Sequence, residues 1–99
     1  MENRYQNMSF STASVLLQVA RLQLQAVEAN IQKYGKLIED IEYNKQNENW
    51  KLILGEEEFQ GIEQALADYK QIVEQATIVE KPTLEAEIKQ LEAKFKKVH

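Results

Sequence analysis

Apolar residues recur at steps of three and four along the first half of the chain. They are Phe10, Ala13, Leu17, Ala20, Leu24, Val27, Ile31, Tyr34, Ile38 and Ile41. This heptad spacing keeps one face of a helix against a partner helix. The alternating segment LQLQA also favours helix over strand, because the helical period continues on both sides of it. The pattern predicts a long helix over 10–46, which Ser9 or Ser11 can cap.

Two shorter heptad stripes follow a polar break at 44–49. They consist of Phe59, Ile62, Leu66, Tyr69, Val73 and Ala76, and then of Leu84, Ile88, Leu91, Phe95 and Val98. The β-branched residues before Pro82 favour the end of one helix, and Pro82 itself favours the first turn of the next. We therefore expect helices over 56–79 and 83–98.

These three helices define the expected domain organisation. Residues 1–8 have no apolar period and are expected to form a flexible N-terminal arm, followed by a single helical domain over 9–99. The short apolar run WKLIL, at 50–54, is expected to be an extended connector across one end of a bundle. We predict an all-α fold, in which two shorter helices pack antiparallel on a long N-terminal helix as a three-helix bundle of coiled-coil type.

The expected helices differ in length, and this difference bears on association. At about 1.5 Å per residue, the first would be roughly 50 Å long, the second roughly 33 Å and the third roughly 24 Å. Short connections would bring the second helix back to near Leu24 and place the third beside 27–41. Residues 10–23 would then have no cover from their own chain.

The part expected to be uncovered carries a second apolar stripe, roughly opposite the first. Its members are Val15, Val19, Leu22, Ala26 and Ala29. Each large side chain left in water costs on the order of 1.5–3 kcal/mol relative to burial, and such patches usually mark interfaces. We predict that copies of the chain associate here as a homo-oligomer, with a dimer favoured, unless the first helix bends and folds onto its own bundle. The predicted interface residues are Val15, Leu16, Val19 and Leu22.

Three aromatic residues have two interpretations each. Trp50 is a separate interface candidate, since Trp is enriched at binding hot spots; the simpler interpretation is an anchor that plugs one end of the bundle. Tyr34 and Tyr69 fall on the stripes and are expected to be core rings with their hydroxyls at the rim. If an oligomer enclosed a cavity, they would instead line a ligand site.

Composition argues against most catalytic chemistry. The chain of 99 residues has no Cys and a single His, His99, which is expected to be a frayed tail. The stripes hold no Glu, and the Glu-x-x-His pairs of di-metal bundles are absent from the sequence, as are phosphate-binding glycine loops and nucleophile elbows. We expect no enzymatic activity, no catalytic residues, no cofactor and no metal.

Charge and hydropathy restrict the partners and the compartment. The formal net charge is −4, from 16 acidic and 12 basic residues, and it does not favour binding to nucleic acid or to an anionic membrane. Gln18 and Arg21 interrupt the apolar run, which is too short for a membrane span and lacks the features of a signal peptide. Together with the absence of Cys, this favours a cytoplasmic protein.

The sequence favours a non-catalytic helical module that binds itself, and a further protein, through apolar helix faces. Such a module would serve as an adaptor, an inhibitor or an assembly subunit. A helical oligomer that sequesters a small ligand is one alternative, and a structural component of a filament or particle is another.

Overall fold

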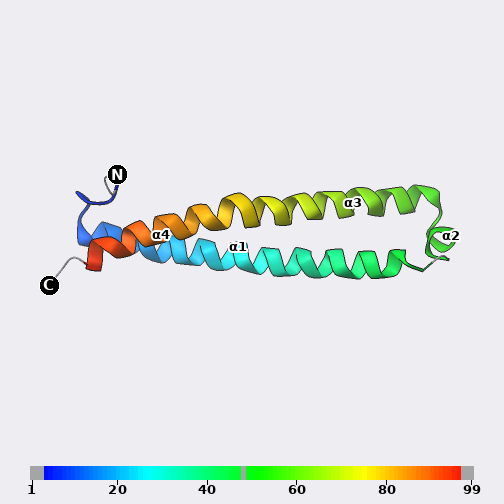
Figure 1. Ribbon diagram of the computed structural model, residues 1–99, viewed down its shortest axis with the longest axis horizontal. Coiled ribbons are helices and arrows are strands. Elements are labelled where there is room, and N and C mark those ends of the chain that lie inside the picture. The colour runs from blue at the N-terminus through cyan, green and yellow to red at the C-terminus, as the bar shows by residue number, and fades with distance from the viewer. Residues whose placement is uncertain (1–3, 48, 97–99) are drawn as a thin grey trace.

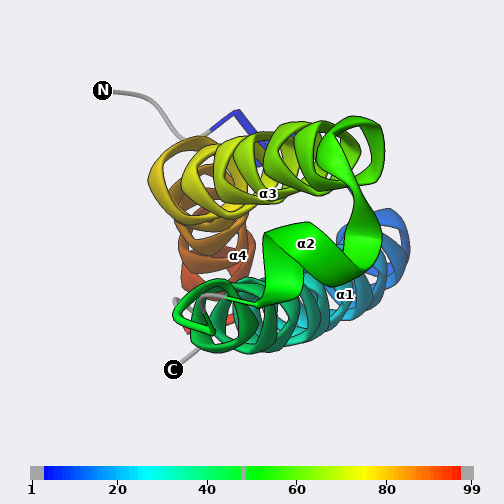
Figure 2. The same cartoon turned by 90° about the vertical axis from the view of Figure 1, so that its right-hand side faces the viewer.

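The computed structural model describes residues 4–47 and 49–96, which form an elongated helical hairpin (Figure 1). Helix α1 (Phe10–Lys45) is one rod. The short α2 (Trp50–Leu54) lies across the tip, as the end-on view in Figure 2 shows. Helix α3 (Glu56–Gln75), the π-helical turn η1 (Ala76–Glu80) and α4 (Lys81–Lys96) follow one another to form the second rod. The predicted all-α class is confirmed for the described residues.

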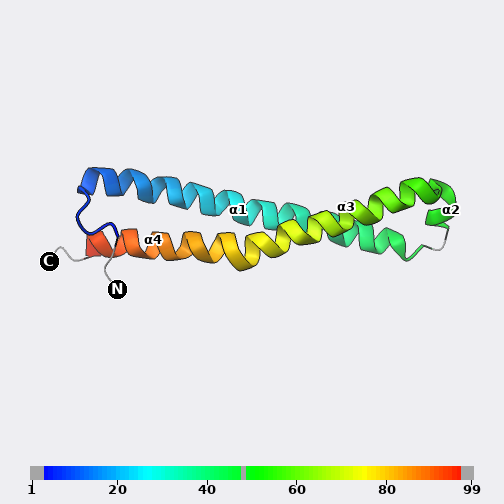
Figure 3. The same ribbon diagram turned by 90° about the horizontal axis from the view of Figure 1, so that it is seen from above.

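The heptad stripes predicted from the sequence form the contact between the two rods. The most buried positions are Ala13, Leu17 and Ala20 on α1, and Leu66, Ala76 and Leu91 on the second rod. Phe10 is exposed, although its ring centroid lies 5.7 Å from that of Phe95. Val98 lies outside the described residues. The rods wind about each other over a molecule of 67 × 19 × 17 Å (Figure 3).

The predicted placement of the third helix is wrong. Helix α4 does not turn back beside 27–41 but continues the direction of α3 and lies along the first half of α1 (Figure 1). Two ion pairs mark this alignment: Arg21 Nη2 lies 2.8 Å from Glu92 Oε2, and Lys81 Nζ lies 3.5 Å from Glu28 Oε2. Since α3 and α4 lie end to end, the expected three-helix bundle is replaced by a hairpin of two rods.

The second rod stays continuous because η1 absorbs one extra residue in the heptad pattern. After Ala76, steps of four and three would place the next stripe positions at 80 and 83, whereas the stripe resumes at Leu84. The backbone N–H of Lys81 donates to the Ala76 carbonyl, five residues earlier, so the turn is wider than an α-helical one. The α4 stripe thereby returns to the face that contacts α1, although Pro82 lies in the first turn of α4.

The tip of the hairpin also departs from expectation. Residues 50–54 form the short helix α2 instead of an extended connector. Gly55 ends this helix with a φ of 85°, a conformation that favours glycine because other residues carry a Cβ. The reversal of the chain into α3 follows directly.

Residues 4–8, within the segment expected to be a flexible arm, fold over the free end of the hairpin. Tyr5 is 6% exposed and joins Leu17, Ala20 and Leu91 in the core cluster. Its hydroxyl donates to Glu87 Oε1 at 3.4 Å. A single tyrosine in a polar segment has no periodic signal, which is why the sequence pattern does not reveal this contact.

Candidate interaction surface

The half of α1 expected to be uncovered is partly covered by its own chain. Helix α4 lies against the stripe formed by Ala13, Leu17 and Ala20, and Tyr5 packs on the same cluster. The expectation that 10–23 lack intramolecular cover is therefore wrong. The reason is the continuity of the second rod, which carries α4 along the full free end of α1.

The second apolar stripe nevertheless remains exposed. The side chains of Val15, Leu16, Val19 and Leu22 are 36 to 63% exposed, and we call these four residues the apolar flank. At 3.6 residues per turn they run from the edge of the α4 contact around one side of α1. Another side of this half is polar and carries Ser14, Arg21 and Gln25, while Gln18 lies at the border between that side and the flank. The predicted surface exists, but beside the intramolecular contact and not on a free-standing rod.

A groove between the rods adjoins the apolar flank. Two adjacent pockets form it. The first is lined by residues that include Leu16, Val19, Gln23 and Leu91. The second is lined by residues that include Gln23, Ala26, Val79 and Leu84. Because Gln23 lines both, the groove continues from the free end to η1.

The apolar flank lies in an almost uncharged half of α1. Between Arg4 and Glu28 the sequence holds one charged residue, Arg21, which pairs with Glu92. The other half of α1 carries many exposed charged and amide side chains, among them Lys33, Lys36, Glu39, Asp40 and Glu42. The two halves of one helix therefore offer different surfaces to solvent.

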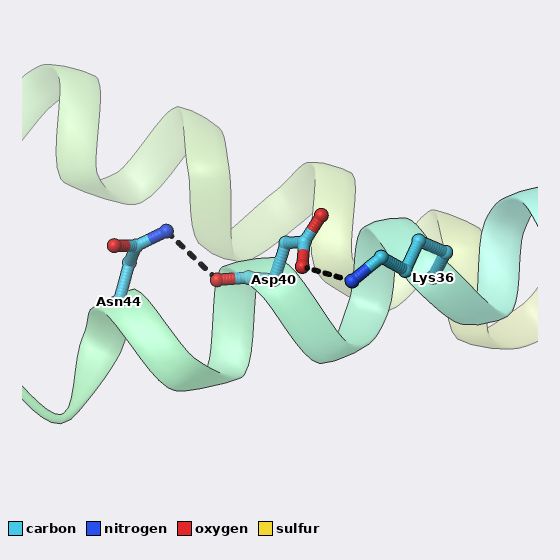
Figure 4. Close-up of polar contacts among 3 residues, drawn as sticks. All are labelled: Lys36, Asp40 and Asn44. Atoms are coloured by element: carbon cyan, nitrogen blue, oxygen red, sulfur yellow. Dashed lines mark hydrogen bonds and ion pairs between the residues drawn. The ribbon is translucent and has the colours of Figure 1, made fainter.

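The polar half is illustrated by three residues at helical spacing (Figure 4). Lys36 Nζ donates to Asp40 Oδ1 at 3.1 Å, and Asn44 Nδ2 donates to the Asp40 carbonyl at 2.8 Å. The hydrogen bond to Asp40, together with the negative charge of that carboxylate, raises the pKa of Lys36 above 10.5. All three residues are exposed, as expected of a solvated face.

Trp50 lies at the far end of the molecule from the apolar flank (Figure 1). Its half-buried ring meets the Phe59 ring edge-on, with centroids 6.3 Å apart. Leu52 and Ile53 beside it are strongly exposed. The sequence indicates Trp50 as an interface candidate but does not indicate Leu52 or Ile53. A run of five apolar residues has no period that would show which side chains face outward.

The remaining candidates from the sequence are two tyrosines on the stripes and the terminal histidine. The Tyr34 and Tyr69 rings are half-buried and lie close to each other between the rods, with centroids 5.3 Å apart.

Within residues 4–47 and 49–96, no three His, Cys, Asp or Glu side chains group so as to hold a metal ion. His99 lies outside this part of the chain. In the same described part, no helix is both long enough and apolar enough to cross a membrane.

The apolar flank and the adjoining groove are the features of the described residues that indicate a functional surface. Comparison of the chain with protein-family models, with curated proteins and with solved structures finds no match.

Proposed function

We propose that this protein is a non-catalytic helical module that self-associates through its apolar flank. The observation that carries the proposal is the position of the flank. Four large aliphatic side chains lie side by side on a half-helix whose one charged residue is Arg21, and a groove runs along their edge. Contiguous exposed apolar surface of this kind marks interaction sites in soluble proteins.

The thin core of the hairpin supports the same proposal. Among the described residues seven hydrophobic side chains are buried, and three of these seven are alanines. Two helices in contact bury one narrow stripe each, and small domains are close to the limit of stability. Association through the flank would add large aliphatic side chains to the buried set and so stabilise the fold.

Molecular mass in solution tests the proposal. The double variant Val19→Glu, Leu22→Glu places two charges on the flank, and its mass should fall to that of one chain, 11.5 kDa. The control Ser14→Glu, Gln32→Glu adds the same charge at exposed positions of α1 that have no flank residue three or four positions away, and it should keep the wild-type mass. Each charge on the flank would have to be desolvated without a partner, and this costs several kcal/mol.

Light scattering with size-exclusion chromatography measures these masses, and circular dichroism verifies that each variant stays helical. A wild-type chain that remains monomeric at the highest concentration reached would overturn the proposed self-association. Equal dissociation of the flank variant and the control would move the interface away from the flank.

A further inference from the structure

We infer that the apolar flank is covered by the same flank of a second copy of this chain. The two α1 helices would cross antiparallel about a two-fold axis that passes between Val19 and Leu22. The inference rests on the proposed self-association and adds the partner, the direction and the register. Surface area, charge and residue spacing each support it.

The accessible surface of the chain indicates how much area a partner could bury. Its accessible surface is 7623 Å². A compact monomer of the same mass exposes roughly 5,800 Å², so the hairpin exposes roughly 1,800 Å² more. A standard interface buries about 800 Å² on each partner. The excess is therefore large enough for one interface of standard size.

The distribution of charge favours a second copy over an acidic or basic partner. In an isologous interface the same patch is present on both sides, so a charged patch would face its own sign near the axis. The one charge in this half of α1, on Arg21, lies on the other side of the helix and pairs with Glu92. Arg4 and Glu87, which line the groove beside the flank, pair with each other at 3.5 Å. The flank and its edge therefore carry no excess of either charge that would attract a charged partner or repel a second copy.

The spacing of the exposed residues favours an antiparallel arrangement. The stripe Val15, Val19, Leu22, Ala26 advances by four, three and four residues, and this series reads the same in both directions. An antiparallel copy therefore places Val19 beside the partner's Leu22, and Val15 beside the partner's Ala26. The second pairing sets a larger side chain against a small one, which helps two helices to interdigitate.

The groove extends this contact beyond the two α1 helices. Leu16 and Val19 border the groove, and α4 forms its other wall. A partner α1 on the flank would lie alongside this groove. Two α1 and two α4 segments would then form a four-helix bundle at the centre of the dimer, and the two hairpin tips would point in opposite directions.

Cysteine cross-linking tests the arrangement, since the natural chain contains no Cys. A mixture of Val15→Cys chains with Ala26→Cys chains should form a disulfide-linked heterodimer under mild oxidation. Val15→Cys chains alone should not link, because two copies of residue 15 would lie roughly 16 Å apart along an antiparallel pair and a disulfide needs Cα atoms about 5.5–6 Å apart. A mixture of Ser14→Cys with Gln32→Cys chains is the control, because these exposed positions lie on α1 away from the flank.

Each outcome separates this inference from the proposed function. Heterodimer formation in the first mixture alone, from a wild type with the mass of two chains, supports the arrangement. Efficient linking of Val15→Cys to itself, or of the control mixture, overturns the arrangement and leaves self-association standing. A mass that grows without limit with concentration overturns the closed dimer in favour of a filament. A monomeric wild type overturns both.

Discussion

At the scale of single residues, Tyr5 shows how one side chain outside the periodic pattern closes the free end of the hairpin. Its ring fills the space beside Leu17 and Leu91, and its hydroxyl reaches Glu87 on α4. Burial of the phenol raises the pKa of Tyr5 above 10.0, and the nearby negative charge of Glu87 acts in the same direction. The neutral form of the side chain therefore stabilises the fold.

This residue gives a pH dependence of stability with a definite sign. Because the folded-state pKa of Tyr5 is raised, its contribution is fully present below pH 10.0 and is lost as the pH rises through the folded-state pKa. We expect the free energy of unfolding of the wild type to fall in this alkaline range more steeply than that of Tyr5→Phe, which keeps the ring but cannot ionise. Denaturant titrations across the range measure both slopes, and equal slopes would contradict the expectation.

At the scale of elements, η1 decides whether the chain forms two rods or three. The β-branched residues and Pro82 locally favour a helix end, and the sequence pattern predicts one there. The wider π turn instead carries the chain past Pro82, and Thr83 Oγ1 donates to the Val79 carbonyl at 2.6 Å. Contacts of α4 with α1 over Ile88, Leu91 and Phe95 outweigh the local preference, since propensity is a weak determinant once tertiary packing is available.

The extra residue in η1 should make the chain tolerate a deletion in this turn but not an insertion. Deleting Ile78, an exposed residue, from a Pro82→Ala chain restores the regular heptad pattern, so the hairpin should keep its stability within about 1 kcal/mol. Inserting one alanine after Ile78 in the same background rotates α4 by about 100° and moves Leu91 off the seam. This should cost about 2–5 kcal/mol, as for loss of a buried leucine.

Thermal and denaturant unfolding of both variants, with Pro82→Ala alone as the reference, measure the difference. If deletion destabilises the chain as much as insertion does, η1 is not the device that keeps the two stripes in phase.

At the scale of the whole molecule, the hairpin is long and thin, and the proposed dimer would be longer still. One chain extends over 67 Å. With the axis between Val19 and Leu22, each copy projects about 24 residues of α1, plus its tip, away from the axis. The two tips would then lie roughly 90 Å apart, at 1.5 Å of helix per residue.

Small-angle X-ray scattering measures this length directly. We expect a maximum dimension close to 90 Å for the wild type and close to the 67 Å of one chain for Val19→Glu, Leu22→Glu. A dimeric wild type with the shorter dimension would mean that the two hairpins lie fully side by side, which is incompatible with the staggered arrangement.

The sequence by itself determined which residues face the helix contact and which face outward. The stripes from Ala13 to Ile41 and from Phe59 to Leu91 face the contact between helices, as their period predicts, and the exposure of Val15, Val19 and Leu22 follows from the same period. Helical period is a local property: each position depends on neighbours three and four residues away, so the pattern alone reveals it.

The tertiary structure alone decided how these stripes pair and what else joins them. Whether α4 returns or continues depends on one wide turn and on contacts between residues some 70 positions apart, such as Arg21 with Glu92. The burial of Tyr5 against α4 likewise depends on an element that lies far away in the sequence. Such pairings depend on the difference in free energy between complete folds of the chain, such as two rods or three helices. The local spacing of apolar residues does not reveal this difference.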